Sequence, residues 1–216
     1  VGTKAATFFE LEDDYEIEIG LTPNRSDAMG HIGVARDLVA YLNVHENAGL
    51  SLNIPNVDNF KVDNNSLPIG IEVENAELCP RYMGTTIKGV KVAPSPSWLQ
   101  KRLRSIGLSP INNVVDVTNF VMHELGNPLH AFDVAKLESN IVVKNALEGD
   151  VFTTLDEVER KLSSDNMMIT NGSDHLCIAG VFGGDDSGIK DKTTDVFLES
   201  AYFNPVSVRK TAKFHG

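Results

Sequence analysis

The sequence lacks the features of disulfide-stabilised, secreted and membrane-spanning proteins. Its 216 residues include only two cysteines, Cys79 and Cys177, and these lack the spacing of zinc ligands. Two thiols in a reducing compartment are therefore expected rather than a structural disulfide. The apolar runs are all much shorter than the about 20 residues that cross a bilayer. Because the chain starts at Val1 and has no charged-then-apolar leader, we expect an excised fragment of a cytoplasmic protein with no membrane partner.

Motifs of common hydrolases and nucleotide-binding enzymes are missing too. The chain has no Gly-x-Ser-x-Gly elbow, Walker loop, His-Glu-x-x-His motif or EF-hand loop. Residues 207–210 (SVRK) and 164–166 (SDN) match two β-lactamase motifs, but in reverse order, and we interpret the match as coincidence. Asp185 and Asp186 lack further spaced ligands, which favours a loop over a metal site. No nucleophile and no metal site are therefore expected.

Basic residues are scarce, and the net charge is −11. This balance argues against nucleic acid, DNA included, as a broad ligand, because such binding neutralises phosphates. The acidic excess lies in residues 1–78, with 4 Lys/Arg against 14 Asp/Glu, whereas residues 79–216 carry 15 against 16. Basic clusters at 101–104 and 209–213 fit either local phosphate contacts or ordinary solvated helix faces.

The pattern of apolar residues predicts an α+β fold in which helices pack around mainly antiparallel sheets. Short β runs separated by Gly, Asn, Asp and Ser predict strands at 69–73, 141–143, 151–153, 167–169, 176–178 and 196–198, and a strand pair at 82–92. Ser95-Pro96 and Asn204-Pro205 are cap-plus-first-position signals for two helices, the first of which ends at Gly107.

The beginning of the chain predicts a small strand–helix portion. Alternation at residues 15–19 is typical of a half-exposed strand. Ser26 is placed to cap a helix whose apolar residues recur every three or four positions from 28 to 42. The Asn-, Asp- and Ser-rich stretch 43–68 is expected to be an irregular connection. The predicted domains are a partial strand–helix domain with its connection at 1–70 and a second domain at 71–216.

Residues 110–133 combine an amphipathic helix with a histidine just beyond its end. Apolar residues recur at helical spacing over 114–125, and Asn112 or Asn113 is expected to cap the first turn. His130 follows in a predicted polar loop, between apolar neighbours. It fits either a pocket-lining imidazole or a histidine that is merely hydrogen-bonded at a helix-to-loop junction.

Two further stretches are candidate binding sites. Residues 177–185 form a strand end rich in glycine, where another molecule can approach the backbone and free N–H groups can hold a carbonyl or phosphate. A set of tight turns is the alternative. Glu199 lies between apolar residues, where a carboxylate is costly unless it is paired or lines a polar cleft. A structural ion pair and a ligand contact both remain open for Glu199.

Five motifs, in order, resemble the beta subunit of bacterial phenylalanyl-tRNA synthetase over essentially the whole chain. They are LTPNRSDAMGHIGVARDL, CPRYMG, NNVVDVTNFVMHELGNPLHAFD, IAGVFGGDDSG and FLESAYF. The part from Cys79 onward is similar to that subunit's editing domain, and residues 1–70 resemble a strand–helix portion of a neighbouring domain.

The resemblance implies hydrolysis of tyrosine wrongly attached to phenylalanine tRNA. The family's pocket histidine falls on His130 and its threonine–asparagine pair on Thr118 and Asn119. The residues expected to bind the substrate are Glu199, which meets the tyrosine hydroxyl, and the small residues Ala179, Gly183 and Gly180. No mismatch with the family's pattern occurs at these positions.

A second site that selects tyrosine by its hydroxyl group is physically sensible. A pocket for phenylalanine cannot strongly exclude an isostere with one extra hydroxyl, so a second site is needed. A buried Glu199 is satisfied by tyrosine and left unpaired by phenylalanine, which can discriminate by roughly 10⁴. Without a nucleophile, water is expected to attack the ester, positioned by His130, Asn119, backbone groups and the terminal ribose of the tRNA. Whether His130 acts as a base or as an orienting group stays open.

The resemblance also implies partners. These are the 3′ end of phenylalanine tRNA and a catalytic alpha subunit in a heterotetramer, on which ATP and Mg²⁺ chemistry is expected. No cofactor is expected in this chain. The rival hypothesis is a non-catalytic module that holds tRNA or the partner subunit. An independent protease-like hydrolase is a weaker third hypothesis.

Overall fold

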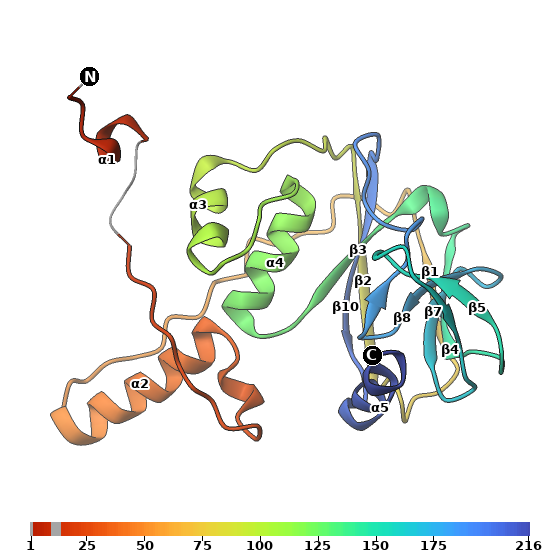
Figure 1. Cartoon of the computed structure of the whole chain (residues 1–216), viewed down its shortest axis with the longest axis horizontal. Helices are drawn as coiled ribbons and strands as arrows, with labels where there is room; N and C mark the ends of the chain where they lie inside the picture. Colours follow the sequence, from red (N-terminus) through yellow and green to blue (C-terminus); the bar gives the residue numbers. More distant parts are fainter. Residues whose placement is uncertain (1, 10–13) are drawn as a thin grey trace.

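The computed structural model describes residues 2–9 and 14–216, and its strands form two main sheets flanked by helices (Figure 1). Within these described residues, β1 and β4 run parallel, and every other strand pair is antiparallel. The predicted α+β fold is confirmed.

The five-stranded sheet has the order β1-β4-β7-β8-β9. Its strands are β1 (Gly70–Val73), β4 (Asn140–Asn145), β7 (Met167–Thr170), β8 (His175–Ile178) and β9 (Phe182–Gly183). β7 is buried along its whole length, because its neighbours cover both edges and side chains cover both faces. A separate hairpin pairs β5 (Val151–Thr153) with β6 (Glu159–Lys161).

The three-stranded sheet has the order β2-β10-β3. Its strands are β2 (Arg81–Lys88), β10 (Asp195–Tyr202) and β3 (Leu129–Asp133). The central strand β10 is paired over its full length with β2 and over five residues with β3. This pairing fixes which side chains of the three strands share a face.

One hydrophobic core joins the two sheets. Phe132 and Phe197 of the three-stranded sheet are fully buried and belong to the same cluster as Ile141, Ile169 and Cys177 of the five-stranded sheet. The two phenylalanine rings lie 6.4 Å apart between centroids. Side chains of this shared face are therefore held between two packed layers.

Three helices follow the predicted positions. α3 (Ser97–Ser105) and α4 (Asn113–Leu125) pack on each other, and α5 (Pro205–His215) ends the chain. Asn112 caps α4 by accepting from the N–H groups of Val114 and Val115, and Asn204 caps α5 in the same way. Pro96 is the N-cap residue of α3, whereas the sequence pattern predicted Ser95 as the cap and Pro96 as the first helical residue.

The beginning of the chain differs from its prediction. It contains α1 (Ala5–Phe8), a 3₁₀ turn η1 (Ser26–Ala28) and α2 (His31–Glu46). Ser26 opens the turn rather than capping α2, whose N-cap is Gly30. The strand predicted at 15–19 is wrong, because Tyr15 and Ile17 are exposed and no neighbouring strand in the described ranges pairs with them. Residues 10–13 of this stretch lie outside the described residues.

Three further elements depart from the sequence patterns. The strand pair predicted at 82–92 is a single strand, β2, which ends before the positive-φ turn at Gly89. The loop predicted around His130 is strand β3, which pairs with β10. The short η2 turn (Val134–Lys136) follows it.

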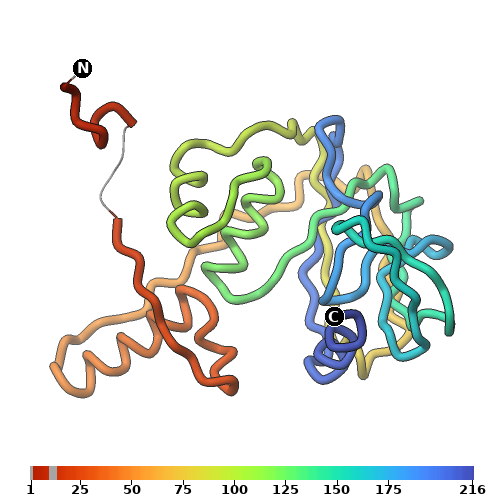
Figure 2. The backbone as a smooth tube through the Cα atoms, in the orientation of Figure 1, coloured from red at the N-terminus to blue at the C-terminus, as the bar shows by residue number. Residues whose placement is uncertain are grey.

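The connection after α2 carries no helix or strand until β1, as Figure 2 shows.

Candidate functional site

Glu199 lies in the middle of β10, directly opposite His130 on β3 and Gly84 on β2. Residues directly opposite in an antiparallel pair place their side chains on the same face. Glu199 shares that face with Phe197, so it points toward the core between the two sheets, and it is only 6% exposed. A carboxylate here is buried among apolar groups, and burial raises its pKa from 4.5 to about 7.

Tyr82 supplies the hydrogen bond that this buried carboxylate needs. Its phenol O–H donates to Oε2 of Glu199 at 2.5 Å, from a position on β2 two residues before Gly84. This bond opposes the effect of burial on the pKa of Glu199. In turn, burial and the adjacent carboxylate raise the pKa of Tyr82, so the phenol stays protonated and remains a donor. The pair is thus a charge-assisted hydrogen bond between two strands.

His130 lies between Glu199 and the five-stranded sheet. Its ring packs edge-on against Phe132 at 4.4 Å between centroids, and its Nε2 lies 3.5 Å from the Sγ of Cys177. Burial lowers the pKa of His130 to about 4, so the imidazole is neutral at pH 7. A neutral imidazole can donate through one nitrogen and accept through the other.

Gly183 of β9 lies so close to His130 that the position has no room for a side chain. A Cβ on Gly183 would lie 3.1 Å from Cε1 of His130 and 2.7 Å from Cδ1 of Leu155. Gly183 pairs with Cys177, so both face the imidazole. Leu155 is 56% exposed and donates its N–H to the carbonyl of Gly183. This end of the site is therefore the one nearest to solvent.

Ala179 and Gly180 lie at the turn between β8 and β9. Ala179 is buried in the same core cluster as Cys177. Gly180 has a φ of +70°, which disfavours any side chain, and a Cβ there would meet Val208 of α5 at 3.0 Å and Phe203 at 3.2 Å. The structure thus brings His130, Glu199, Gly183 and Ala179 to one interface between the sheets, with Gly180 beside it.

Thr118 and Asn119 lie on a different element, α4, which packs against β3. Thr118 is buried, and its hydroxyl donates back to the carbonyl of Val115 within the helix. No recorded hydrogen bond of the described residues joins Thr118 or Asn119 to His130 or Glu199.

Sequence reasoning missed Tyr82 as a member of this site. Tyr82 belongs to the CPRYMG motif, but it is 117 residues from Glu199 in the chain. Only the register of β2 with β10 brings the two side chains together. The one available signal was that a buried carboxylate requires a donor from somewhere in the fold.

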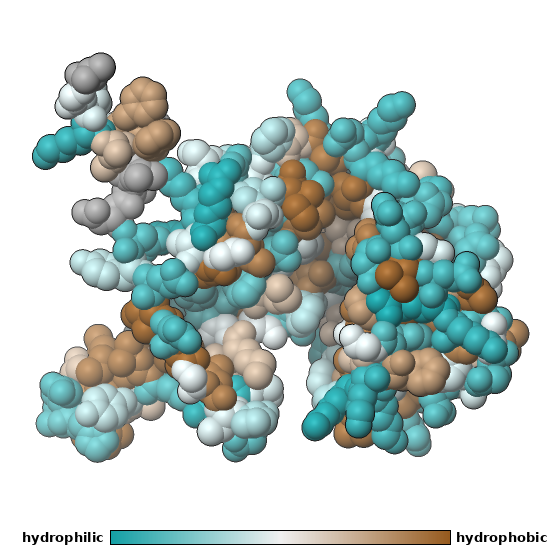
Figure 3. All heavy atoms as spheres, in the orientation of Figure 1, coloured by the Kyte–Doolittle hydropathy of each residue, from teal (hydrophilic) through white to brown (hydrophobic). Residues whose placement is uncertain are grey.

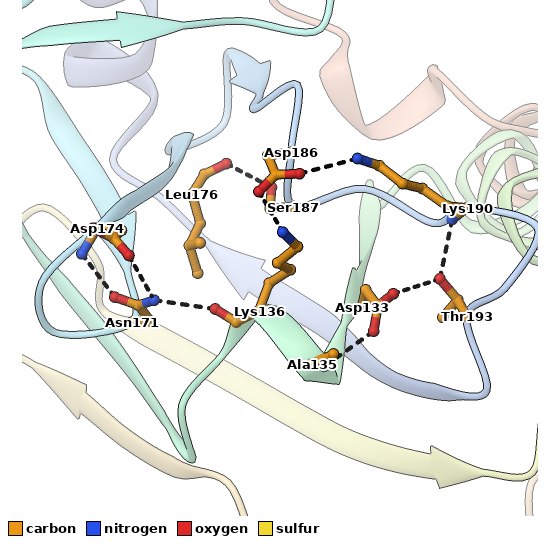
Figure 4. Close-up of polar contacts among 10 residues, drawn as sticks. All are labelled: Asp133, Ala135, Lys136, Asn171, Asp174, Leu176, Asp186, Ser187, Lys190 and Thr193. Carbon is orange, nitrogen blue, oxygen red and sulfur yellow. Dashed lines mark hydrogen bonds and ion pairs between the residues drawn. The ribbon is translucent and has the colours of Figure 1, made fainter.

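A separate polar cavity of about 460 Å³ lies on the other side of the glycine-rich strand end, next to Gly184, and is lined by residues of β5, β8 and the 171–175 and 184–187 turns. Figure 4 shows its rim, where Lys136 and Lys190 both pair with Asp186, and Asn171 joins Lys136 to Asp174. These groups satisfy one another. Among the described residues, no group of His, Cys, Asp and Glu is arranged to hold a metal ion.

Comparisons with known proteins agree with the sequence motifs. A family model described as the B3/4 domain matches residues 78–216. Over all 216 residues, the chain is 55% identical to the phenylalanine–tRNA ligase beta subunit of Bacteroides thetaiotaomicron. It is 50% identical to the Porphyromonas gingivalis subunit and 51% identical to that of Carboxydothermus hydrogenoformans, in each case over 99% of this chain.

The chain spans about a quarter of those relatives, since it covers 26% of each. An N-terminal fragment of the phenylalanyl-tRNA synthetase beta subunit from Pyrococcus horikoshii superposes with a TM-score of 0.49 at 15% identity, over 89% of this chain and 58% of that one. That likeness is too low to carry any residue across. The match over 78–216 and the identities over the whole chain confirm the predicted resemblance: the chain belongs to the B3/4 domain family and is similar throughout to phenylalanine–tRNA ligase beta subunits.

Proposed function

We propose that this chain hydrolyses the ester that joins tyrosine to phenylalanine tRNA, as the editing part of a phenylalanyl-tRNA synthetase beta subunit. The observation that carries the proposal is the pairing of Glu199 with Tyr82 beside His130. A carboxylate that accepts a phenol hydroxyl in a nearly closed setting has the chemistry that recognition of tyrosine needs.

The selection of tyrosine over phenylalanine follows from the burial of Glu199. Glu199 is 6% exposed, so water does not satisfy its carboxylate when a ligand without a hydroxyl fills the space. A tyrosine side chain offers the donor, whereas a phenylalanine ring leaves an acceptor unpaired. Leaving a buried charged acceptor unpaired costs at least 1–3 kcal/mol, roughly 5-fold to 150-fold in binding.

The ester is proposed to lie toward His130 and the Gly183 end of the site. His130 is a weak base because its pKa is about 4, which favours a role in holding the attacking water by hydrogen bonds over removing its proton. Gly183 brings the backbone of β9 close to the imidazole, and Ala179 and Gly180 keep the turn beside it small. Thr118 and Asn119 are proposed to contact the terminal ribose from α4, the helix that packs on the strand of His130.

The assembly around the chain is proposed from the relatives. Their name, phenylalanine–tRNA ligase beta subunit, points to phenylalanine tRNA and a further subunit as partners. From the motif resemblance we propose that this subunit is a catalytic alpha subunit in a cytoplasmic heterotetramer. ATP and Mg²⁺ are assigned to that alpha subunit. No helix among the described residues is long and apolar enough to cross a membrane.

The test measures two activities of the synthetase that carries this chain: deacylation of tyrosyl-tRNA and charging of phenylalanine. We expect Glu199→Ala and Gly183→Trp to slow deacylation about 100-fold while charging stays normal. The matched control is Glu159→Gln, at an exposed position of β6, which should leave both activities at the wild-type level.

Unchanged deacylation in both site variants would refute the hydrolase. A loss of tRNA or alpha-subunit binding in these variants, without a change in deacylation per bound tRNA, would support the rival scaffold module instead.

A further inference from the structure

Tyr82 occupies the position that a substrate phenol would need. Its hydroxyl donates to Oε2 of Glu199, and it lies on the same face of the sheet as Gly84, two residues along β2. The bond joins a residue of this chain to the same acceptor that the proposed function assigns to the tyrosine of the substrate. The site therefore already holds a phenol when no ligand is bound.

We propose that Tyr82 is an internal stand-in for the substrate, which releases the carboxylate of Glu199 when an incoming tyrosine side chain takes its place. The identity of the incoming phenol rests on the proposed function. The exchange itself rests on the hydrogen bond and on the lack of free space around the carboxylate.

The space around Glu199 is closed while Tyr82 is bound. Glu199 is 6% exposed, so almost none of its surface is open to solvent. At the facing position on β2, even one added carbon on Gly84 would overlap the ring of Phe197. A second aromatic ring cannot approach the carboxylate unless a side chain moves.

Tyr82 is the side chain best placed to move. It lies on β2, an edge strand of the three-stranded sheet, and is only partly buried, whereas Phe197 and Phe132 are fully enclosed. Its ring neighbour Phe203, 6.5 Å away between centroids, follows the end of β10. Rotation of Tyr82 away from β10 lets an incoming phenol replace it, so the buried carboxylate has a phenol donor before and after the exchange with tyrosine.

The hydrogen bond between Tyr82 and Glu199 lowers the affinity of the site for any ligand that must displace Tyr82. The fraction of molecules with a free carboxylate is small, so the apparent dissociation constant of any ligand in this site is raised by the inverse of that fraction. The same factor applies to tyrosine and phenylalanine. Removing the hydroxyl of Tyr82 therefore tightens both ligands equally and leaves their ratio unchanged.

The experiment measures binding of L-tyrosine and L-phenylalanine by calorimetry to the full chain and to its variants. We expect Tyr82→Phe to bind both amino acids about tenfold more tightly, since it removes a competing hydrogen bond to a charged group. Tyr202→Phe, at an exposed tyrosine of β10, is the matched control and should bind as the wild type does. Thermal unfolding checks that Tyr82→Phe is folded.

A second measurement keeps the wild-type hydrogen bond in place. 3-Fluorotyrosine at position 82 reports its surroundings by ¹⁹F NMR, and added L-tyrosine should move its signal toward that of an exposed residue. Weaker or unchanged binding in Tyr82→Phe, a ¹⁹F signal that does not move, or no binding of L-tyrosine to either protein would each overturn the exchange.

These outcomes are separate from those of the proposed function. Tighter amino-acid binding in Tyr82→Phe by a synthetase that fails to deacylate tyrosyl-tRNA would support phenol exchange and refute the hydrolase. Deacylation by the wild type together with slower deacylation by Tyr82→Phe would refute the exchange and make Tyr82 a fixed positioning residue.

Discussion

At the scale of single residues, the site consists of two titratable groups whose pKa values are shifted in opposite directions by the same burial. The pKa of Glu199 is raised to about 7 and that of His130 is lowered to about 4. Both shifts favour the neutral forms, because the layer between the two sheets excludes water. The hydrogen bond from Tyr82 is the one contact that favours the charged form of Glu199.

The raised pKa of Glu199 predicts a loss of stability with rising pH. The stabilising contribution is complete below pH 4.5 and is lost as pH rises through about 7, because the folded state then releases its extra proton. Glu199→Gln does not titrate. We expect its free energy of unfolding, relative to the wild type, to increase by up to about 3 kcal/mol between pH 4.5 and pH 8.

Urea unfolding of both proteins at the two pH values measures this difference, and all other titrating groups cancel in it. A difference that stays constant with pH would mean that Glu199 is not buried as described.

The lowered pKa of His130 predicts the opposite trend. Its contribution to stability is complete above pH 6.5 and is lost as pH falls through about 4, since the unfolded state then binds the extra proton. Relative to His130→Asn, we expect the wild type to lose up to about 3 kcal/mol of unfolding free energy between pH 7 and pH 4. Urea unfolding across this range checks the sign, and a gain by the wild type on acidification would contradict it.

Sequence reasoning reached some of these residues and not others. Glu199 was singled out because a carboxylate among apolar residues is costly, and the structure places it in such a setting. The pairing of His130 with Glu199 and the contact of Glu199 with Tyr82 depend on strand register across a long separation in the chain. Local patterns carry no information about register between distant strands.

At the scale of elements, β10 organises the site because it is the central strand of its sheet. It holds Glu199 between β2, which brings Tyr82, and β3, which brings His130. The helix α4 precedes β3 directly, so the length and end of α4 set where β3 begins. Its termination at Gly126, with a φ of +80°, turns the chain into the strand.

The N-cap of α4 gives a prediction about stability. Asn112 accepts hydrogen bonds from the N–H groups of Val114 and Val115, each at 3.0 Å. Asn112→Ala leaves these donors without that partner, and we expect the free energy of unfolding to fall by about 1 kcal/mol. Asn65→Ala, in the exposed connection, is the control and should change it by no more than about 0.5 kcal/mol. Equal stability of the two variants in urea unfolding would contradict the cap.

Strong periodic patterns predicted most elements. The helical stripes of α3 and α4, the cap of α5 and the β runs of β4, β7, β8 and β10 were all anticipated and are confirmed. Residues 15–19 alternate as a strand does but have no pairing partner in the described residues, and alternation alone does not form a sheet. The short strands β6 and β9 carry too few residues to show a period, and β3 was obscured by its polar His130 and Asp133.

At the scale of the whole molecule, the two ends of the chain differ in how they are packed. The residues of both hydrophobic clusters lie at or after Ile69. Before that point the described residues include large exposed apolar side chains, such as Tyr15 at 90% and Val57 at 75%. Figure 2 shows α1 and α2 lying apart from the sheets, whereas the end of the connection reaches β2, where Lys88 donates to Ser66. Figure 3 shows apolar side chains on the surface of this first part.

This distribution predicts that the chain from residue 69 onward folds without the first part. The polar contacts that such a truncation removes lie at exposed groups: the His31 ring with the carbonyl of His123, Asp14 with Arg102, and Lys88 with Ser66. We expect a cooperative unfolding transition in near-UV circular dichroism, with a midpoint within about 5 °C of that of the full chain. A truncated chain without such a transition would contradict the predicted boundary at residue 70.

The most direct test of the central claim is a crystal structure of the chain with a non-hydrolysable analogue of its proposed substrate, adenosine carrying tyrosine in amide linkage at the 3′ position. We predict the phenol oxygen of the analogue within hydrogen-bonding distance of the Glu199 carboxylate, with the amide end closer to His130 and the Tyr82 side chain rotated away. An analogue bound elsewhere, with Tyr82 still on Glu199, would contradict the account.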